Sequence, residues 1–314
     1  MDALYNAAKP RVVAIGGPTA TGKTALSVAL AKRFGGEIIS ADSMQIYQGL
    51  DVGTAKVTPE EMQGVPHHLV GFLAPEQAFS VADFTTLAGK TITQLTAQGK
   101  LPLVVGGTGL YITSLLNGIG FTPEKVDPAI RQELQARLQA EGSHALYAEL
   151  AAVDPGYAAK VHPNNTPRVI RALELYRATG RKMSAEREAA RPAEKPYRSL
   201  CLCLTCRDRT LLYQRIDTRC DRMMQRGILE EAKLVYDHRD TYRTAAQAIG
   251  YKEFFPYFEQ TASLEACADK LKQASRNYAK RQLTWFRHMD GVVWLNAGAP
   301  EGRKRVHTPR HKDS

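Results

Sequence analysis

Residues 11–34 have the sequence RVVAIGGPTATGKTALSVALAKRF, and this stretch decides the fold. Residues 11–16 form a short β-branched run that ends in glycine, which predicts a buried parallel strand. Apolar side chains then recur at helical spacing as far as Phe34, and two glycines end that helix. The segment between them, residues 17–24, matches the pattern G-x-x-x-x-G-K-[ST]. Together these features predict an α/β domain with a phosphate-binding loop.

The spacing within residues 17–24 serves a chemical purpose. Glycines allow consecutive backbone N–H groups to converge on phosphate oxygens at the positive end of the following helix. Lys23 supplies a mobile positive charge, and the hydroxyl of Thr24 can reach a magnesium ion. A fortuitous glycine turn is the alternative, which the strand and helix on either side disfavour. We therefore expect phosphate to be bound by Gly17, Pro18, Thr19, Ala20, Thr21, Gly22, Lys23 and Thr24.

The chain beyond this loop continues to alternate between strands and helices. Residues 49–76 are rich in Gly, Pro and His and are predicted to form a long functional loop. Right-handed crossovers between the strands give a P-loop NTPase-like parallel sheet flanked by helices, so the predicted fold class is α/β. Strands are predicted at residues 37–40, 101–105, 199–204 and 291–295, and helices at residues 23–34, 80–99 and 110–116.

Strand patterns disappear between residues 124 and 198, which predicts an all-helical insertion domain with helices at 128–140, 143–153 and 167–179. Its last part, residues 181–198, has six Lys or Arg, three Glu and two Pro, which is typical of an exposed basic linker. We thus predict a discontinuous catalytic core of residues 1–123 and 199–300, interrupted by the insertion at 124–198. Residues 301–314 contain five Lys or Arg and are predicted to be a disordered basic tail.

The composition is that of an ordinary globular protein with excess positive charge. The 314 residues include 42 Lys plus Arg and 32 Asp plus Glu, a net charge of +10. No run approaches the ~18 apolar residues of a membrane span, and the first ten residues lack the apolar centre of a secretory signal. Five cysteines are too few for a disulfide scaffold. We expect a cytoplasmic chain with no membrane contact, and the charge favours nucleic acid or phosphates as partners, with solubility as the alternative.

A phosphate loop alone does not define what happens to the phosphates. An ATPase normally places a carboxylate at the end of an apolar strand to hold magnesium. The strand at 101–105 is instead followed by Gly106-Gly107-Thr108-Gly109, which contains no carboxylate. Asp42 instead follows the strand at 37–40. Because the carboxyl ends of parallel strands face one crevice, Asp42, Thr108 and the phosphate loop should converge there. Asp42 is a candidate general base or metal ligand, and a helix cap is the alternative.

Two further patterns could indicate a metal site. Cys201, Cys203 and Cys206 form C-x-C-x-x-C, but the first two share one face of a strand and no fourth ligand has zinc-type spacing. This favours buried strand cysteines. For the pair His67-His68, hydrogen bonding or packing is favoured over metal ligation.

In their order along the chain, the motifs resemble those of the tRNA dimethylallyltransferase family, also called tRNA isopentenyltransferases or IPP transferases. The resemblance covers roughly residues 11–290, and the ordered set is specific where a single phosphate loop is not. It rests on residues 17–24, 42–47, 53–56, 67–69, 106–111, 127–128 with Arg131, 163–165, 168–174, 248–253 and 278–287.

The resemblance implies transfer of the five-carbon group of dimethylallyl diphosphate to the exocyclic amine of the adenosine 3′-adjacent to the anticodon of tRNA, with release of diphosphate. It implies Lys23, Thr24 and Arg219 as catalytic residues around the diphosphate, with Mg²⁺ held by Thr24 and the donor. Asp42 would accept the proton of the attacking amine. Arg219 lies where the family carries a diphosphate-contacting arginine, eight residues before Gly227, and a surface helix charge is the alternative.

The resemblance also implies the anticodon stem-loop of tRNA as the partner, with the target base extruded into the site. Residues 270–287 carry six Lys or Arg, no acid and interleaved aromatic residues, which suits RNA contact. An amphipathic helix with a core-facing Trp285 is the alternative. The expected tRNA-binding residues are Asp42, Ser43, Met44, Gln45, Thr108, Arg131, Pro167, Arg168, Val169, Ile170, Arg171, Gln247, Gly250, Tyr251, Lys252, Lys280, Arg281, Gln282, Thr284, Trp285 and Arg287.

Two other classes of function fit parts of the chain. A P-loop small-molecule or nucleoside kinase fits the N-terminal third, but it leaves the basic insertion and residues 270–287 without a role. A non-catalytic, nucleotide-gated RNA-binding module is the third class. The sequence departs from the family pattern at Pro167, where a polar or basic residue is more common, and at Cys220, where a branched apolar residue is common. Nothing suggests an obligate dimer, so a monomer is expected.

Overall fold

The structure, a computed structural model, describes residues 9–121, 127–190, 192, 194–298 and 305–306. The chain forms two compact units: unit 1 comprises residues 1–116 and 196–314, and unit 2 comprises residues 117–195. The boundaries expected from the sequence lie a few residues later along the chain. Most of the expected tail, residues 301–304 and 307–314, lies outside the described residues.

Unit 1 is built on one sheet with the strand order β3-β2-β4-β1-β5-β6-β7. Neighbouring strands pair in parallel except β6 and β7, which are antiparallel. The predicted parallel α/β sheet is therefore confirmed, and the carboxyl ends of its parallel strands meet at one edge. The strands are β1 (Arg11–Gly16), β2 (Gly36–Ser40), β3 (His67–His68), β4 (Leu101–Val105), β5 (Arg198–Thr205), β6 (Val292–Asn296) and β7 (Arg305–Val306).

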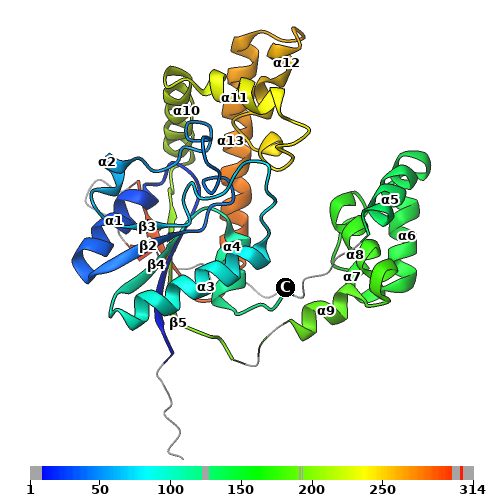
Figure 1. Cartoon of the computed structure of the whole chain (residues 1–314), viewed down its shortest axis with the longest axis horizontal. Coiled ribbons are helices and arrows are strands. Elements are labelled where there is room, and N and C mark those ends of the chain that lie inside the picture. The colour runs from blue at the N-terminus through cyan, green and yellow to red at the C-terminus, as the bar shows by residue number, and fades with distance from the viewer. Residues whose placement is uncertain (1–8, 122–126, 191, 193, 299–304, 307–314) are drawn as a thin grey trace, which may run out of the picture. The chain divides into compact units, whose positions relative to one another are not determined.

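Helices cover both faces of this sheet (Figure 1). Because successive side chains of a strand point to opposite faces, Ala14 packs with Phe84 and Ile112 on one face, whereas Ile15 packs with Val28 on the other. The first face is covered by α3 (Val81–Ala97) and α4 (Gly109–Leu116), and the second by α1 (Lys23–Phe34).

A largely helical part of unit 1 stands beyond the carboxyl edge of the sheet (Figure 1). Its apolar core includes Tyr47 and Leu50 from the segment after β2, together with Tyr251 and Phe254. The longest helix, α13, belongs to both cores, because its C-terminal Phe286 packs with the sheet. The elements of this part are α10 (Arg209–Gln225), α11 (Ile228–Asp237), η1 (Ala245–Gln247), η2 (Lys252–Phe254), α12 (Phe255–Phe258) and α13 (Leu264–Arg287).

Unit 2 is all-helical in its described residues and has its own apolar core, which includes Leu134, Leu150 and Leu173. The buried carboxylate of Asp154 accepts hydrogen bonds from Tyr157 N (3.0 Å) and Ser184 N (2.8 Å) and so joins two of its helices. The helices are α5 (Pro128–Glu141), α6 (Ser143–Val153), α7 (Pro155–Ala158), α8 (Thr166–Thr179) and α9 (Met183–Ala189).

Three expectations need correction. Residues 49–76 are not one continuous loop, because they contain α2 (Pro59–Met62) and β3. Residues 181–198 are not only a linker, because they contain α9. Two residues of the expected disordered tail form β7, which pairs with β6. None of the helices in the described part of the chain is both long enough and apolar enough to span a membrane.

Candidate active site

The segment between β1 and α1 folds into a backbone cradle. Gly17 and Gly22 have φ values of +130° and +78°, which side-chain-bearing residues rarely adopt. A Cβ at Gly17 would lie 2.4 Å from the carbonyl oxygen of Leu204 on β5, so the loop and this strand approach too closely for any other residue. The buried hydroxyl of Thr21 donates to the carbonyl oxygen of Pro18 at 2.8 Å and closes the turn. The cradle lies at the N-terminus of α1, where backbone N–H groups and the helix dipole favour an anion.

A cavity of about 900 Å³ lies beside this cradle, within unit 1. Its wall includes Lys23 and Thr24 from the start of α1, Asp42 from the segment after β2 and Arg219 from α10. The structure thus brings together, in one cavity, the phosphate loop, the carboxylate and the arginine that the sequence analysis selected as catalytic candidates.

Lys23 and Arg219 are two partly buried members of the larger set of cations that lines this cavity. Burial, and next the positive charge of Arg219, lower the pKa of Lys23 to about 8, although Asp42 acts in the opposite direction. Burial also lowers the pKa of Arg219, again opposed by Asp42. Lys23 Nζ donates to Pro18 O at 2.8 Å. Because two close, partly buried positive charges destabilise each other, an anion that enters between them is bound favourably.

Asp42 is both a capping residue and a cavity residue. Its Oδ1 accepts hydrogen bonds from Met44 N (2.9 Å) and Gln45 N (3.3 Å), which is the geometry of a cap. The turn is also held by Thr108, whose Oγ1 accepts a hydrogen bond from Ser43 N at 3.1 Å. The two alternatives for Asp42 are therefore compatible, since capping through Oδ1 orients a carboxylate that faces the cavity.

Helix α13 contributes two side chains to the centre of the site. The buried amide of Gln282 accepts from Thr19 N through Oε1 and donates to Gly107 O through Nε2, each at 3.0 Å. Tyr278, one helical turn earlier, lines the cavity, and burial followed by the charge of Asp42 raises its pKa to about 12. Tyr278 is not among the individual site residues predicted from the sequence, although its position four residues before Gln282 places both on one face of the helix.

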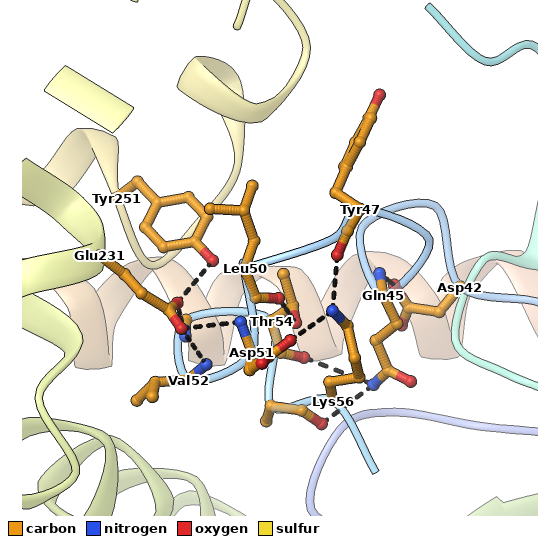
Figure 2. A network of polar contacts seen from close by, with 12 residues as sticks. Asp42, Gln45, Tyr47, Leu50, Asp51, Val52, Thr54, Lys56, Glu231 and Tyr251 are labelled. Atoms are coloured by element: carbon orange, nitrogen blue, oxygen red, sulfur yellow. Dashed lines mark hydrogen bonds and ion pairs between the residues drawn. The ribbon is translucent and has the colours of Figure 1, made fainter. Parts of the chain in front are cut away.

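One wall of the cavity is lined by residues 52–56, and we call residues 51–56 the wall loop. Gln45 Nε2 donates to Ala55 O (3.0 Å) and Thr54 O (3.4 Å), which ties the wall loop to the segment that carries Asp42 (Figure 2). Lys56 lines the cavity and donates to the carbonyl oxygen of Tyr47 at 2.5 Å. Gln45 is an expected tRNA-binding residue, and its side-chain amide nitrogen already donates hydrogen bonds to these two backbone carbonyl oxygens.

The residues expected from the sequence divide into two sets within unit 1. Those that line the cavity are Thr19, Ala20, Gly22, Lys23, Thr24, Asp42, Ser43, Met44, Gln45, Arg219, Gln247, Lys252, Arg281 and Gln282. Those that do not line it are Gly17, Pro18, Thr21, Thr108, Gly250, Tyr251, Lys280, Thr284, Trp285 and Arg287. In the second set, Lys280, Thr284 and Arg287 are exposed on α13.

The side chains of three expected tRNA contacts already have partners inside unit 1, and their contact with tRNA stays a prediction. Tyr251 is fully buried, and Gln282 is 5% exposed with both amide groups hydrogen-bonded. Trp285 donates from Nε1 to the hydroxyl of Thr113 at 3.0 Å and packs so closely that a Cβ at Gly109 would lie 2.3 Å from its ring. The structure therefore favours the alternative of a core-facing tryptophan.

Unit 2 carries the remaining expected residues on α5 and at the start of α8. Arg131 forms two hydrogen bonds to the buried carboxylate of Glu174, at 2.9 and 2.8 Å, and Arg171 forms one at 3.0 Å. Although burial opposes the shift, these bonds lower the pKa of Glu174. The side chains of Val169 and Ile170 belong to the apolar core, so only their backbone remains available to a ligand. Pro167 and Arg168 begin the same helix, and Arg168 is exposed.

The cysteine and histidine patterns are both used structurally. Cys201, Cys203 and Cys206 are buried, and burial raises the pKa of the first two thiols. His68 Nε2 lies 2.6 Å from the carboxylate of Glu37, and His67 Nδ1 lies 2.8 Å from a backbone carbonyl oxygen. No cluster of three or more His, Cys, Asp or Glu suited to a metal ion occurs among the residues that the structure describes.

Two family models match this chain. The model described as IPP transferase matches residues 45–289, and the model described as isopentenyl transferase matches residues 10–70. Among curated relatives, the chain is 49% identical to the tRNA dimethylallyltransferase of Bacillus subtilis over 295 residues, which covers 94% of this chain and 93% of the relative. It is 48% identical to the tRNA dimethylallyltransferase of Geobacillus thermodenitrificans over 291 residues, 93% of this chain and 92% of the relative.

Solved structures show the same likeness. The full-length tRNA isopentenylpyrophosphate transferase of Bacillus halodurans is 46% identical, with a TM-score of 0.68 and coverage of 92% of this chain and 90% of that one. A eukaryotic dimethylallyltransferase acting on tRNA is 32% identical, with a TM-score of 0.77 and coverage of 92% and 74%.

Proposed function

Because the chain belongs to the IPP transferase family, we propose that it transfers the dimethylallyl group of dimethylallyl diphosphate to the exocyclic amine of the adenosine 3′-adjacent to the anticodon of tRNA. The products are N6-dimethylallyladenosine in the tRNA and diphosphate. One observation carries the proposal: the partly buried cations Lys23 and Arg219 and the carboxylate of Asp42 line the same cavity, beside a backbone phosphate cradle. The cations suit the diphosphate, and the carboxylate suits the proton that the amine must lose.

The diphosphate of the donor is bound by the cradle, Lys23 and Arg219. These groups act most strongly on the leaving group, because its negative charge grows as the bond to carbon breaks. Burial and then repulsion from Arg219 lower the pKa of Lys23, and the repulsion is relieved when the diphosphate lies between the two side chains. Donor binding and leaving-group stabilisation therefore come from the same two side chains.

We also propose that Mg²⁺ accompanies the donor. The hydroxyl of Thr24 lines the cavity next to Lys23, and the described residues provide no cluster of protein ligands for a metal. This donor set fits Mg²⁺, which is commonly held by one or two protein oxygens together with substrate phosphates and waters. When bound, Mg²⁺ offsets the charge of the departing diphosphate. Thr24 would hold the ion together with phosphate oxygens of dimethylallyl diphosphate.

Asp42 acts on the acceptor. The adenine amine is a weak nucleophile, because its lone pair is delocalised into the ring. As the amine attacks, a bond forms between its nitrogen and C1 of the donor, the bond from C1 to the diphosphate oxygen breaks, and its electron pair leaves with the diphosphate. The amine proton passes to the carboxylate of Asp42, which the N–H groups of Met44 and Gln45 hold in orientation.

The tRNA partner is proposed to contact both parts of the chain. Exposed cations on α13, Lys280, Arg281 and Arg287, and the exposed Arg168 and Arg171 of α8 suit the phosphates of an anticodon stem-loop. We propose that residues 124–198, which include most of unit 2, form the tRNA-contacting insertion. The anticodon loop must release the target adenine from its stack so that the base reaches Asp42. We further propose that the protein acts as a monomer in the cytoplasm.

The deciding experiment is incubation with labelled dimethylallyl diphosphate and unmodified tRNA, followed by nucleoside analysis. The expected result is labelled N6-dimethylallyladenosine and an equal amount of diphosphate. A parallel reaction with labelled ATP tests the kinase alternative, and transfer of its phosphate to a nucleoside without any prenylation would overturn the proposal. Omission of Mg²⁺ should slow the transfer.

A further inference from the structure

A carboxylate outside the cavity wall collects four hydrogen bonds. Glu231, in the first turn of α11, accepts from Asp51 N and Val52 N at 2.7 Å each through Oε1. Its Oε2 accepts from Gly53 N and from the hydroxyl of Tyr251 at 2.9 Å each. Figure 2 shows the carboxylate between the wall loop and the tyrosine. None of the groups assigned above to donor binding or proton transfer uses Glu231.

The three backbone donors are consecutive, and their convergence forms a small concavity of the kind that binds anions. Here the bound anion is a side chain of the protein itself. Within the wall loop, the backbone bonds are Ala55 N to Val52 O and Lys56 N to Asp51 O, both at 2.9 Å. Hydrogen bonds to a carboxylate are stronger than such neutral bonds, so Glu231 contributes more than they do to the position of the loop.

Close packing on the other side of the loop supports the same role. A Cβ at Gly53 would lie 2.3 Å from the ring of Tyr251, and a Cβ at Gly250 would lie 2.8 Å from the carbonyl oxygen of Gly53. Gly250 also has a φ of +114°. Two chain segments that are almost 200 residues apart in sequence thus approach without intervening side chains. The wall loop is therefore fixed by a buried aromatic ring as well as by the carboxylate.

The wall loop is itself hydrogen-bonded to the segment that carries Asp42. Gln45 Nε2 donates to the carbonyl oxygens of Thr54 and Ala55, and the backbone N–H of Gln45 donates to Asp42 Oδ1 at 3.3 Å. Hydrogen bonds, joined by the short stretch of wall-loop backbone and by Gln45 itself, therefore link Glu231 to Asp42. The phosphate cradle is held separately, by Gln282 at Thr19 N.

We propose that Glu231 is a positioning residue for the transfer reaction: it fixes the wall loop, and through Gln45 it fixes the turn that presents Asp42 to the acceptor amine. The inference rests on the proposed function. Because Glu231 acts on the turn of Asp42 and not on the cradle, its loss should affect the transfer step much more than binding of dimethylallyl diphosphate.

Steady-state kinetics of Glu231→Ala and Glu231→Gln test this. A displacement of about 1 Å in a catalytic group lowers rates by about 100-fold, so we expect kcat of Glu231→Ala to fall by about 10- to 100-fold, with KM for dimethylallyl diphosphate changed by less than about threefold. The kcat of Glu231→Gln should fall less, because the amide oxygen of glutamine still accepts hydrogen bonds. The matched control is Glu230→Ala, which removes an equal charge from an exposed side chain in the same helical turn and should behave as the unmodified protein.

Hydrogen exchange adds a readout that does not depend on turnover. Amide exchange in a peptide that covers residues 48–57 should be faster in Glu231→Ala than in Glu230→Ala, while a peptide from residues 14–25 should exchange equally in both. All rates are compared below the melting temperature of each variant. If Glu231→Ala does not fold, Tyr251→Phe, which removes one of the four hydrogen bonds, gives the same comparison with a smaller effect.

The outcomes separate this inference from the proposed function. If the unmodified protein prenylates tRNA and folded Glu231→Ala retains its kcat, the inference is wrong and the proposed function stands. If the donor KM rises as much as kcat falls, the role is general structural support, and the inference is likewise wrong. If the unmodified protein does not prenylate tRNA, the proposed function is wrong, and the inference that rests on it falls with it.

Discussion

The side chain of Gln282 accepts a hydrogen bond from the backbone N–H of Thr19, which joins the last long helix to the phosphate cradle across 263 residues of sequence. Its amide nitrogen simultaneously donates to Gly107 O at 3.0 Å. There is no room for a larger residue at that position, since a Cβ on Gly107 would lie 2.1 Å from this nitrogen. The cradle and the loop after β4 therefore share one buried amide, and α13 determines the distance between them.

Gln282→Ala should weaken donor binding. The variant leaves Thr19 N–H and Gly107 O without their partner, and a lost buried hydrogen bond costs about 1–3 kcal/mol. We expect a lower melting temperature and a donor KM raised by about tenfold, which corresponds to about 1.4 kcal/mol of binding free energy. Gln273→Ala removes an exposed amide from the same helix and serves as the control. An unchanged donor KM would show that α13 does not hold the cradle.

Asp42→Asn should abolish most turnover while tRNA binding is retained. Asparagine keeps an oxygen that can accept from Met44 N, so the cap survives, but the amide cannot take up the amine proton. General-base catalysis contributes about 10²- to 10⁴-fold, and we expect kcat to fall within this range. Asp208→Asn, in an exposed cap at the start of α10, is the matched control. Gel-shift titration with tRNA measures binding, and a normal kcat in Asp42→Asn would exclude Asp42 as the base.

The pH dependence of kcat/KM for dimethylallyl diphosphate should reflect the titration of Lys23. Because its pKa is lowered to about 8, the free enzyme loses this charge above about pH 8, and kcat/KM for the donor should fall about tenfold per pH unit from there. Stability responds in the opposite direction. Between about pH 8 and pH 10.5 the lysine is largely protonated in the unfolded chain but largely neutral in the folded one. The contribution of Lys23 to the free energy of unfolding therefore rises with pH in that window.

Lys23→Arg is the control for this profile. A guanidinium stays protonated at these pH values, so the variant should lose the decline above about pH 8 even if its absolute rate is lower. Thermal unfolding at each pH separates loss of charge from loss of fold. A decline of equal steepness in Lys23→Arg would assign the titration to another group.

The tRNA affinity should fall steeply with salt. Each phosphate contact releases counterions, so log affinity falls linearly with log salt concentration, and removal of one contact lowers the slope by about one. We expect this change in Lys280→Ala and in Arg287→Ala, whose side chains are exposed on α13. Lys90→Ala removes an exposed charge from α3, outside the expected contacts, and should leave the slope unchanged. A flat salt dependence in the unmodified protein would remove the RNA part of the proposal.

Local patterns were sufficient for elements whose determinants lie within one or two helical turns. Helix α1 spans the predicted residues 23–34, since apolar spacing starts it after the glycine-rich turn and Gly35 in the left-handed conformation ends it. Helix α2 was missed, although Thr58 and Glu61 form a capping box that is visible in the sequence. Strand β3 has no comparable local pattern, because its two residues are a strand only through their pairing with β2.

The sequence by itself determined the phosphate cradle, its flanking strand and helix, and the parallel sheet that carries them, because backbone conformation and apolar periodicity act over neighbouring residues. Only the tertiary structure decided that Tyr278 lines the cavity, that Gln282 spans from the cradle to Gly107, and that Tyr251 lies inside the protein. The partner of a polar side chain depends on which distant helix packs beside it, and packing between distant helices is a property of the whole fold that no local spacing encodes.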